Sequence, residues 1–286
     1  MIRVFKLFGK FPLRLLRFIG VIFSWLHWFS SRKYRKRFKK NWSLANQFCG
    51  NVFRRSSFFS AIGRIGICLF ELPKIWCGTG LRDKVEFEGF DVIEKLLLEK
   101  KGLICLTPHL GSFELIPRVF SQNLPISILY KPSDNALFEK LFQELRPTSN
   151  INMVKTSFTG VKKLLLALNR GEIVGMLPDQ VPPDGYGIEE KFFGKPAYTM
   201  TLACKLILRT QAPVVWVLAR HNSHGWKLSV KEWCYKKTKS ISLKEMIRDM
   251  NKNVEQLIIN EPQSYLWGYD RYKSPKKINL KEQTCD

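Results

Sequence analysis

Acidic residues are absent from the first 70 positions of the chain, although that stretch holds fifteen lysines and arginines. Beyond it, the 286-residue sequence carries a net charge of only about +8, so most of the formal charge of +23 belongs to the N-terminal arm. An arm of one sign excludes a cationic partner. It favours an anionic one, either a membrane surface or a nucleic acid.

Paired cysteines are missing as well. The seven cysteines are scattered, odd in number and form no C-x-x-C motif, which argues against a zinc ribbon and a disulfide framework and favours a reducing compartment. Internal repeats and low-complexity linkers are also absent. With 45% hydrophobic and 13% aromatic residues, the chain has enough apolar material to exclude intrinsic disorder, and its length allows one substantial domain or two small ones.

A clean hydrophobic run long enough to span a bilayer is lacking too. The most apolar N-terminal stretch, residues 11–29, crosses a membrane only if Arg14 and Arg17 snorkel, and Ser24 and His27 weaken it further. An orientation within the membrane interface therefore fits this stretch at least as well as a span. A cleaved signal peptide fits poorly, because the arginines interrupt the apolar region.

The N-terminal arm has the pattern of a basic amphipathic helix. Its basic residues Lys6, Lys10, Arg14 and Arg17 recur on one helical stripe, and seven more lysines and arginines follow between positions 32 and 40. A nucleic-acid-binding arm is the alternative, but the density of Phe, Leu and Trp favours lipid. We predict a membrane-associating helix and basic cluster over residues 1–40, and one catalytic-sized domain over residues 41–286.

Beyond residue 80, short apolar runs alternate with helical patterns. This alternation predicts an α/β fold with a mixed, largely parallel central sheet flanked by helices, behind the N-terminal basic amphipathic or membrane-anchoring helix. The expected strands cover residues 85–88, 103–107, 126–130, 151–154, 173–177, 214–220 and 226–230. The expected helices cover residues 91–100, 112–122, 135–145, 160–169, 199–208 and 243–259.

The segment 103–114 joins an expected strand to an expected helix, the kind of junction where α/β proteins place their chemistry. His109 lies on the turn, Gly111 relaxes the backbone, and Ser112 is placed to cap the helix with Glu114 in its first turn. A carboxylate on one imidazole nitrogen would leave the other free to take a proton from a hydroxyl, so His109 and Glu114 form a candidate general-base dyad. The alternative is a packed histidine beside a helix-terminal carboxylate.

This stretch resembles the H-x4-[DE] motif of the lysophospholipid acyltransferase superfamily, and specifically the branch of lipid A late acyltransferases, the lauroyl and myristoyl transferases. Other blocks match in order and cover most of the chain after residue 80. They are Tyr130-Lys-Pro132 with Asn135 and Arg146, Gly175-Met-Leu-Pro-Asp179-Gln180, Phe192-Phe-Gly194 with Ala197 and Thr199, and Tyr265-Leu-Trp267 with Arg271-Tyr-Lys273.

The resemblance implies transfer of a fatty acyl chain from an acyl carrier protein thioester to a hydroxyl of a lipid A precursor. On that reading His109 deprotonates the hydroxyl, Glu114 orients His109, and attack on the thioester is direct, without an acyl-enzyme, a cofactor or a metal. Cys105 is a poor candidate nucleophile, because it lies inside an apolar strand where a thiolate would be badly solvated.

Four further positions are expected to bind substrate or stabilise the oxyanion: Arg146, Asp179, Gln180 and Lys131. Structural alternatives exist for two of them, because Arg146 could complement a helix dipole and Asp179 could form a turn before the following prolines. The Phe192-Phe-Gly194 block could line an acyl channel or pack in the core. His221 and His224 are expected in a hairpin turn rather than at a metal.

The resemblance also implies partners and a location: acyl carrier protein, a lipid A precursor and anionic lipids, at the cytoplasmic face of the bacterial inner membrane, with no nucleic acid. Two alternatives stay open. One is an acyltransferase for another glycerolipid or glycolipid acceptor, which would use the same dyad. The other is a non-catalytic protein that binds anionic membranes or nucleic acid.

Overall fold

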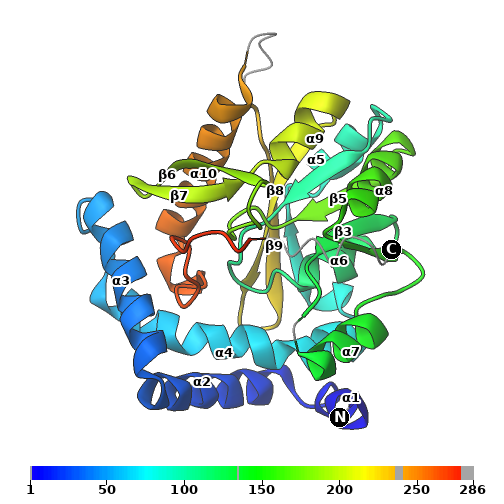
Figure 1. Ribbon diagram of the computed structural model, residues 1–286. Helices are drawn as coiled ribbons and strands as arrows, with labels where there is room; N and C mark the ends of the chain where they lie inside the picture. The colour runs from blue at the N-terminus through cyan, green and yellow to red at the C-terminus, as the bar shows by residue number, and fades with distance from the viewer. Residues whose placement is uncertain (1, 134, 236–240, 278–286) are drawn as a thin grey trace.

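The computed structural model describes residues 2–133, 135–235 and 241–277. Within these ranges a seven-stranded sheet has the order β1-β9-β8-β2-β5-β3-β4, and its neighbouring strands are parallel except for β8 and β9 (Figure 1). The predicted α/β class with a mixed, largely parallel sheet is confirmed. The strands are β1 (Val85–Glu88), β2 (Leu103–Leu106), β3 (Ile126–Tyr130), β4 (Ile151–Lys155), β5 (Ile173–Met176), β8 (Val214–His221) and β9 (Trp226–Glu232).

The central strands are buried on both faces because helices cover both sides of the sheet. Along β2, Ile104 and Leu106 join one apolar core while Leu103 and Cys105 join the other, as the alternation of strand side chains requires. The first core includes α8 (Phe158–Asn169), α9 (Leu202–Thr210) and α10 (Leu243–Asn260). The second includes α5 (Asp91–Leu97), α6 (Leu115–Phe120) and α7 (Ala136–Leu145).

A separate hairpin of β6 (Gly187–Phe192) and β7 (Lys195–Met200) was not expected from the sequence. The helix predicted over residues 199–208 begins only at Leu202, because Thr199 and Met200 complete β7. The hairpin turns at Phe193 and Gly194, whose φ angles of 45° and 72° are both left-handed. The Phe192 and Phe193 side chains are buried in the core, which accounts for the apolar character of this block.

The N-terminal region forms four helices: α1 (Ile2–Phe8), α2 (Leu13–Ser30), α3 (Arg32–Phe48) and α4 (Arg55–Cys77). Helix α4 was not predicted, and the predicted domain boundary at residue 40 falls inside α3. Phe38 and Trp42 of α3 lie in the same apolar core as the sheet. The end of the second predicted domain and Cys285 lie outside the described residues.

The predicted basic stripe is divided between two helices, because Gly9 to Pro12 separate α1 from α2. Lys6, Lys10 and Arg14 are exposed, but Arg17 points inward and its Nε lies 2.6 Å from Oε1 of Glu71 on α4. The spacing that defined the stripe assumed one continuous helix, and proline ends that continuity.

None of the described helices combines the length and the apolar character needed to cross a bilayer.

Helices α2 and α4 pack side by side and α2 lies on the outside of the molecule (Figure 1). Their backbones touch at Gly20 and Gly66, where a Cβ on Gly66 would overlap the carbonyl oxygen of Gly20. Glycine is therefore required at this crossing for steric reasons, not for its backbone freedom.

Replacing Gly66 tests this crossing. We expect Gly66→Ala to lower the free energy of unfolding by about 2 kcal/mol, because the added methyl group forces the helices apart. The matched control is Gly63→Ala on the same helix, where the new Cβ would meet only the Val21 side chain at 3.3 Å and helix propensity improves by about 1 kcal/mol. Denaturant unfolding of both variants measures the difference. Equal stability of the two would contradict the proposed backbone contact.

Candidate active site

The register of the two central strands brings the candidate catalytic groups together. Leu106 of β2 is paired with Met176 of β5 in a parallel ladder, and His109 and Asp179 each lie three residues beyond that pair. Because parallel strands end at the same edge of the sheet, both side chains reach the same place. Their separation of 70 positions in the chain hides this neighbourhood from any local motif.

Asp179 holds His109 through two contacts. Its Oδ1 lies 2.8 Å from Nδ1 of the imidazole, and its Oδ2 accepts the backbone N–H of His109 at 3.0 Å. The Asp179 side chain is 2% exposed and that of His109 is 16% exposed. Burial would raise the pKa of Asp179, but the charge and hydrogen bonds of His109 outweigh this and hold it below its ordinary value.

An ionised Asp179 only accepts hydrogen bonds, so Nδ1 of His109 carries a proton, and in the neutral imidazole the lone pair is then on Nε2. Tyr265 also contacts Asp179: burial, the charge of Asp179 and a hydrogen bond to it raise the pKa of the Tyr265 phenol well above its ordinary value. Tyr265 therefore stays neutral beside the carboxylate. With Nδ1 protonated beside Asp179, the neutral His109 imidazole has the tautomer that a general base needs.

The amide nitrogen of Gln180 lies 2.9 Å from Nε2 of His109. Since Nε2 carries the lone pair, the Gln180 amide donates to it. The amide thus occupies the position from which a substrate hydroxyl would give up its proton. The structure therefore brings together His109, Asp179 and Gln180 of the predicted set.

Glu114 and Arg146 form a separate pair. The guanidinium binds the carboxylate in a fork, with Nε 3.0 Å from Oε2 and Nη2 2.6 Å from Oε1, and Trp76 of α4 donates to Oε2 at 3.1 Å. Arg146 is at the C-terminal end of α7, as expected, and also lies over the rings of Trp76 and Phe142.

The predicted pairing of His109 with Glu114 is not confirmed. The carboxylate that contacts the imidazole is that of Asp179, whereas the contacts of Glu114 lead to Arg146 and Trp76. The physical reason is the irregular turn before α6, which begins only at Leu115 and leaves Glu114 at its N-cap. The five-residue spacing therefore does not place the two side chains face to face.

A small cavity of about 30 Å³ lies beside the Glu114–Arg146 pair, lined also by Cys105, Thr107 and Phe113. It has room for about two water molecules, not for an acyl chain. Burial raises the pKa of the Cys105 thiol, so a thiolate nucleophile is disfavoured, in agreement with the sequence argument.

The turn after His109 is held by backbone contacts from two other segments of the chain. Leu110 bridges Tyr265, Gly111 bridges Ala219, and the Ser112 N–H donates to the Ala219 carbonyl at 2.8 Å. Gly111 has a φ of 65°, and a Cβ there would overlap the Ala219 carbonyl oxygen. Ser112 does not cap α6 as expected, because its hydroxyl donates to Glu71 instead.

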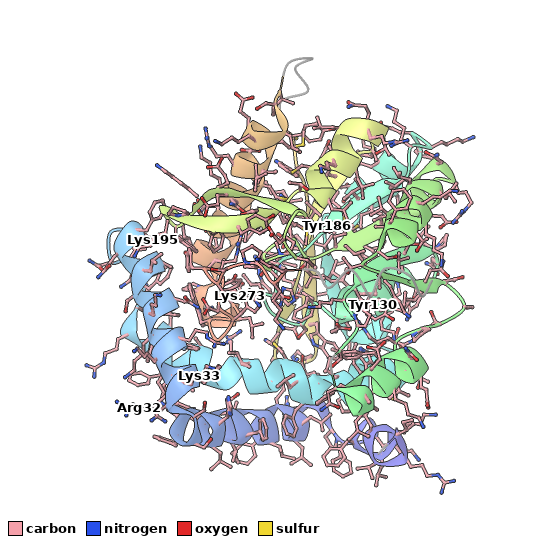
Figure 2. The ribbon with its side chains drawn as sticks, viewed as in Figure 1. Arg32, Lys33, Tyr130, Tyr186, Lys195 and Lys273 are labelled. Atoms are coloured by element: carbon pink, nitrogen blue, oxygen red, sulfur yellow. The ribbon has the colours of Figure 1, made fainter. Side chains whose placement is uncertain are left out.

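The other predicted positions are Lys131 and the histidines of the β8–β9 turn. Lys131 is exposed in the loop after β3, at the same edge of the sheet as His109 and one residue beyond Tyr130 (Figure 2). His221 ends β8 and a short turn leads to β9 at Trp226, so the expected hairpin is confirmed. Among the described residues, no three His, Cys, Asp or Glu side chains are grouped to hold a metal ion.

Sequence reasoning missed several residues that surround the site. Tyr265 lies in a matching block but had no assigned role, and Trp76 and Glu71 belong to the helix that was not predicted. One signal was available for Glu71, which is the first acidic residue of a chain that is otherwise basic up to that point. No local pattern connects it to His109.

The fold and the site define an α/β protein with a histidine just beyond the end of a central strand, held by a buried carboxylate. The family described as bacterial lipid A biosynthesis acyltransferase matches this chain over residues 1–274, so the chain belongs to that family. It is an O-acyltransferase that transfers an acyl group to lipid A.

Individual relatives are distant in sequence but aligned over most of their length. The chain is 24% identical over 219 residues to the lipid A biosynthesis palmitoleoyltransferase of Escherichia coli (strain K12), which covers 73% of this chain and 69% of that protein. It is 26% identical over 225 residues to the lauroyltransferase of the same organism, covering 77% and 73%. A lipid A biosynthesis acyltransferase of Haemophilus influenzae is 24% identical over 281 residues, covering 92% and 86%.

Two substitutions that replace a carboxylate by an uncharged amide distinguish the role of Asp179 from that of Glu114. We expect Asp179→Asn to lower kcat by about 10²–10⁴-fold, because an amide cannot stabilise the imidazolium that forms during proton transfer. Glu114→Gln should lower kcat less than tenfold and should instead reduce the free energy of unfolding by roughly 3 kcal/mol, since it leaves Arg146 without its charge partner. Steady-state kinetics and denaturant unfolding of both variants measure this. The reverse ranking in kcat would restore Glu114 as the partner of His109.

Proposed function

We propose that the protein transfers a fatty acyl chain from the thioester of an acyl carrier protein to a hydroxyl group of a lipid A precursor. Family membership supports the acceptor class. The observation that carries the chemistry is the His109 imidazole with Asp179 on Nδ1, which leaves Nε2 facing Gln180 and the edge of the sheet. Acyl carrier protein as the donor follows from the family resemblance alone.

In the proposed reaction the acceptor hydroxyl displaces the Gln180 amide from Nε2 of His109. Nε2 takes the hydroxyl proton while the oxygen forms a bond to the thioester carbonyl carbon, and the carbonyl oxygen becomes an oxyanion. When this intermediate collapses, the carbon–sulfur bond breaks and the imidazolium gives its proton to the leaving thiolate. Asp179 stabilises the imidazolium between the two steps, and no acyl-enzyme forms.

Other polar side chains have roles that depend on their present contacts. The Gln180 amide starts beside Nε2 of His109, and in the proposed reaction it donates to the oxyanion once it is displaced. Arg146 is already paired with Glu114, so an anionic acceptor that binds Arg146 contacts a guanidinium that keeps its carboxylate partner. Lys131 is exposed at the same edge, where its ammonium can contact a phosphate of the acceptor as a point charge.

We further propose that the enzyme sits on the cytoplasmic face of the inner membrane through α2. Its outer face exposes large apolar side chains, among them Phe18 at 64% and Phe29 at 70%, and a monomer in water gains nothing from this exposure. The next helix adds exposed cations, with Arg32 and Lys33 at the end that adjoins α2 (Figure 2). An apolar stripe beside a basic helix suits a surface of anionic lipid.

Removal of the base tests the reaction. We expect His109→Ala to lose about 10²–10⁴-fold in kcat with unchanged folding, because no other group in the site takes the hydroxyl proton. The control is His224→Ala, an exposed histidine in the β8–β9 turn, and Cys105→Ala should retain most activity. Mass spectrometry of products formed from acyl carrier protein and coenzyme A thioesters, with a lipid A precursor or a lysophospholipid, identifies donor and acceptor together.

Near-normal turnover by His109→Ala would contradict the mechanism. Acylation of the lysophospholipid but not of the lipid A precursor would contradict the proposed acceptor. A trapped acyl-thioester on Cys105 would replace direct transfer with a covalent route.

Membrane binding is tested by making α2 polar. We expect the double variant Phe18→Ser and Phe29→Ser to bind vesicles of phosphatidylethanolamine and phosphatidylglycerol at least tenfold more weakly, since each ring contributes about 2 kcal/mol when buried in the interface. The control is Phe158→Ser, which removes a ring that is 86% exposed at the start of α8. Co-sedimentation measures binding. A larger loss in the control than in the double variant would move the membrane surface away from α2.

A further inference from the structure

Glu71 is the centre of a buried polar cluster that the proposed reaction does not use. Its side chain is 0% exposed, and its carboxylate receives Arg17 from α2, Ser112 from the catalytic turn and Trp226 from β9. His221, at the end of β8, lies with Nε2 3.3 Å from Oε2 of Glu71 and 3.0 Å from the Ser112 hydroxyl. Three segments far apart in the sequence, namely α2, the turn after His109 and the β8–β9 hairpin, therefore meet at the carboxylate of α4.

Such a carboxylate is costly unless its partners are in place. Burial would raise the pKa of Glu71, but the charges and hydrogen bonds of His221, Arg17 and Ser112 lower it to about 2. Glu71 is therefore ionised at neutral pH. Removing one partner leaves a buried charge that must find another or displace its neighbours.

On one side the cluster reaches the turn that carries His109. The Ser112 hydroxyl donates to Oε2 of Glu71 at 2.5 Å, a short bond of the kind that charge assistance produces. Ser112 is three residues after His109, and its N–H is already bound to Ala219. Its side chain is therefore a second attachment point for the turn, besides the backbone bridges.

On the other side the cluster reaches α2. Each of the three guanidinium nitrogens of Arg17 donates to the body of the protein, with Nε 2.6 Å from Glu71, Nη1 2.7 Å from the Asn222 carbonyl and Nη2 2.5 Å from the Gly225 carbonyl. Its side chain is only 14% exposed, although the next residue, Phe18, is on the outer face of α2. Within one turn of α2, Phe18 therefore faces outward and Arg17 faces inward to Glu71.

We propose that Arg17 and Glu71 are positioning residues for the acyl transfer reaction: the seating of α2 sets the turn that carries His109, through Glu71 and the Ser112 hydroxyl. This inference rests on the proposed function in that it takes His109 as the base. When Arg17 is absent, Oε1 of Glu71 loses its charge partner, so the carboxylate that accepts the Ser112 hydroxyl is less firmly oriented and the His109 turn loses part of its support. Near-attack geometry is sensitive to such shifts, and a displacement of about 1 Å costs as much as 10²-fold in rate.

Substitution of Arg17 tests the connection to α2. We expect Arg17→Met to lower kcat by 10- to 100-fold while KM for the thioester donor changes less than twofold, because the change displaces the base and not the donor. The matched control is Arg14→Met, which removes an exposed arginine from the same helix and should leave kcat unchanged. A role in charge attraction to the membrane alone would affect the two variants equally.

Substitution of Ser112 tests the connection to the turn without removing the ion pair. Ser112→Ala should lower kcat to a similar extent as Arg17→Met, and the double variant should lose little more than either single one, since both interrupt one path. The control is Ser121→Ala, a buried serine at the end of α6 whose hydroxyl donates only to the Arg118 carbonyl. Thermal unfolding is measured in parallel, and kinetics are run at least 15 °C below the lowest midpoint, with vesicles and with detergent micelles.

The outcomes separate this inference from the proposed function. If the wild-type enzyme transfers acyl chains and Ser112→Ala keeps wild-type kcat, the positioning role is overturned while the proposed function stands. Additive losses in the double variant, or a change confined to KM, would also overturn it. If the wild-type enzyme transfers no acyl chain to a lipid A precursor, the proposed function fails first. If Arg17→Met does not fold, Ser112→Ala still tests the proposal, because this variant keeps the ion pair between Arg17 and Glu71.

Discussion

The parallel pairing of β2 with β5 is the constraint on which the site depends. It pairs Leu106 with Met176, and three residues beyond this pair the two segments reach His109 and Asp179. Both strands are buried on both faces, so a slip of register would misfit their side chains in both cores and draw the polar residues that flank the strands into the sheet. The hydrophobic effect therefore sets the register, and the register sets the distance between imidazole and carboxylate.

Around this pair the protein holds the His109 turn by many short polar contacts rather than by one large one. Tyr265 contributes a backbone bridge, Ala219 binds Gly111 and Ser112, Asp179 binds the His109 N–H and imidazole, and Glu71 binds the Ser112 hydroxyl. Each contact alone is worth about 1 kcal/mol or somewhat more, but together they restrict the position of the imidazole. In the proposed reaction, a base held in this way gains rate from preorganisation.

The local patterns in the sequence were sufficient for the sheet and insufficient for the site. Continuous apolar runs such as Leu103–Leu106 predicted strands close to their observed positions, because a strand buried on both faces leaves a signal in each residue. The β6–β7 hairpin left no such signal. Its buried Phe192 and Phe193 lie at the turn, and its strands contain Glu, Lys and Pro. The same limit explains Glu114: spacing in a motif states which residues are near in sequence, not which carboxylate reaches Nδ1.

The sequence by itself determined the α/β class, the basic N-terminal arm, the strand that carries His109 and the polar positions that follow strands, because these depend on composition and on local periodicity. Only the tertiary structure decided that Asp179 is the partner of His109, that Glu114 binds Arg146, and that Arg17 turns inward to Glu71. Each of these contacts joins residues between 32 and 70 positions apart. They exist because strand order and helix packing bring those residues together, and neither is written in any short stretch of the chain.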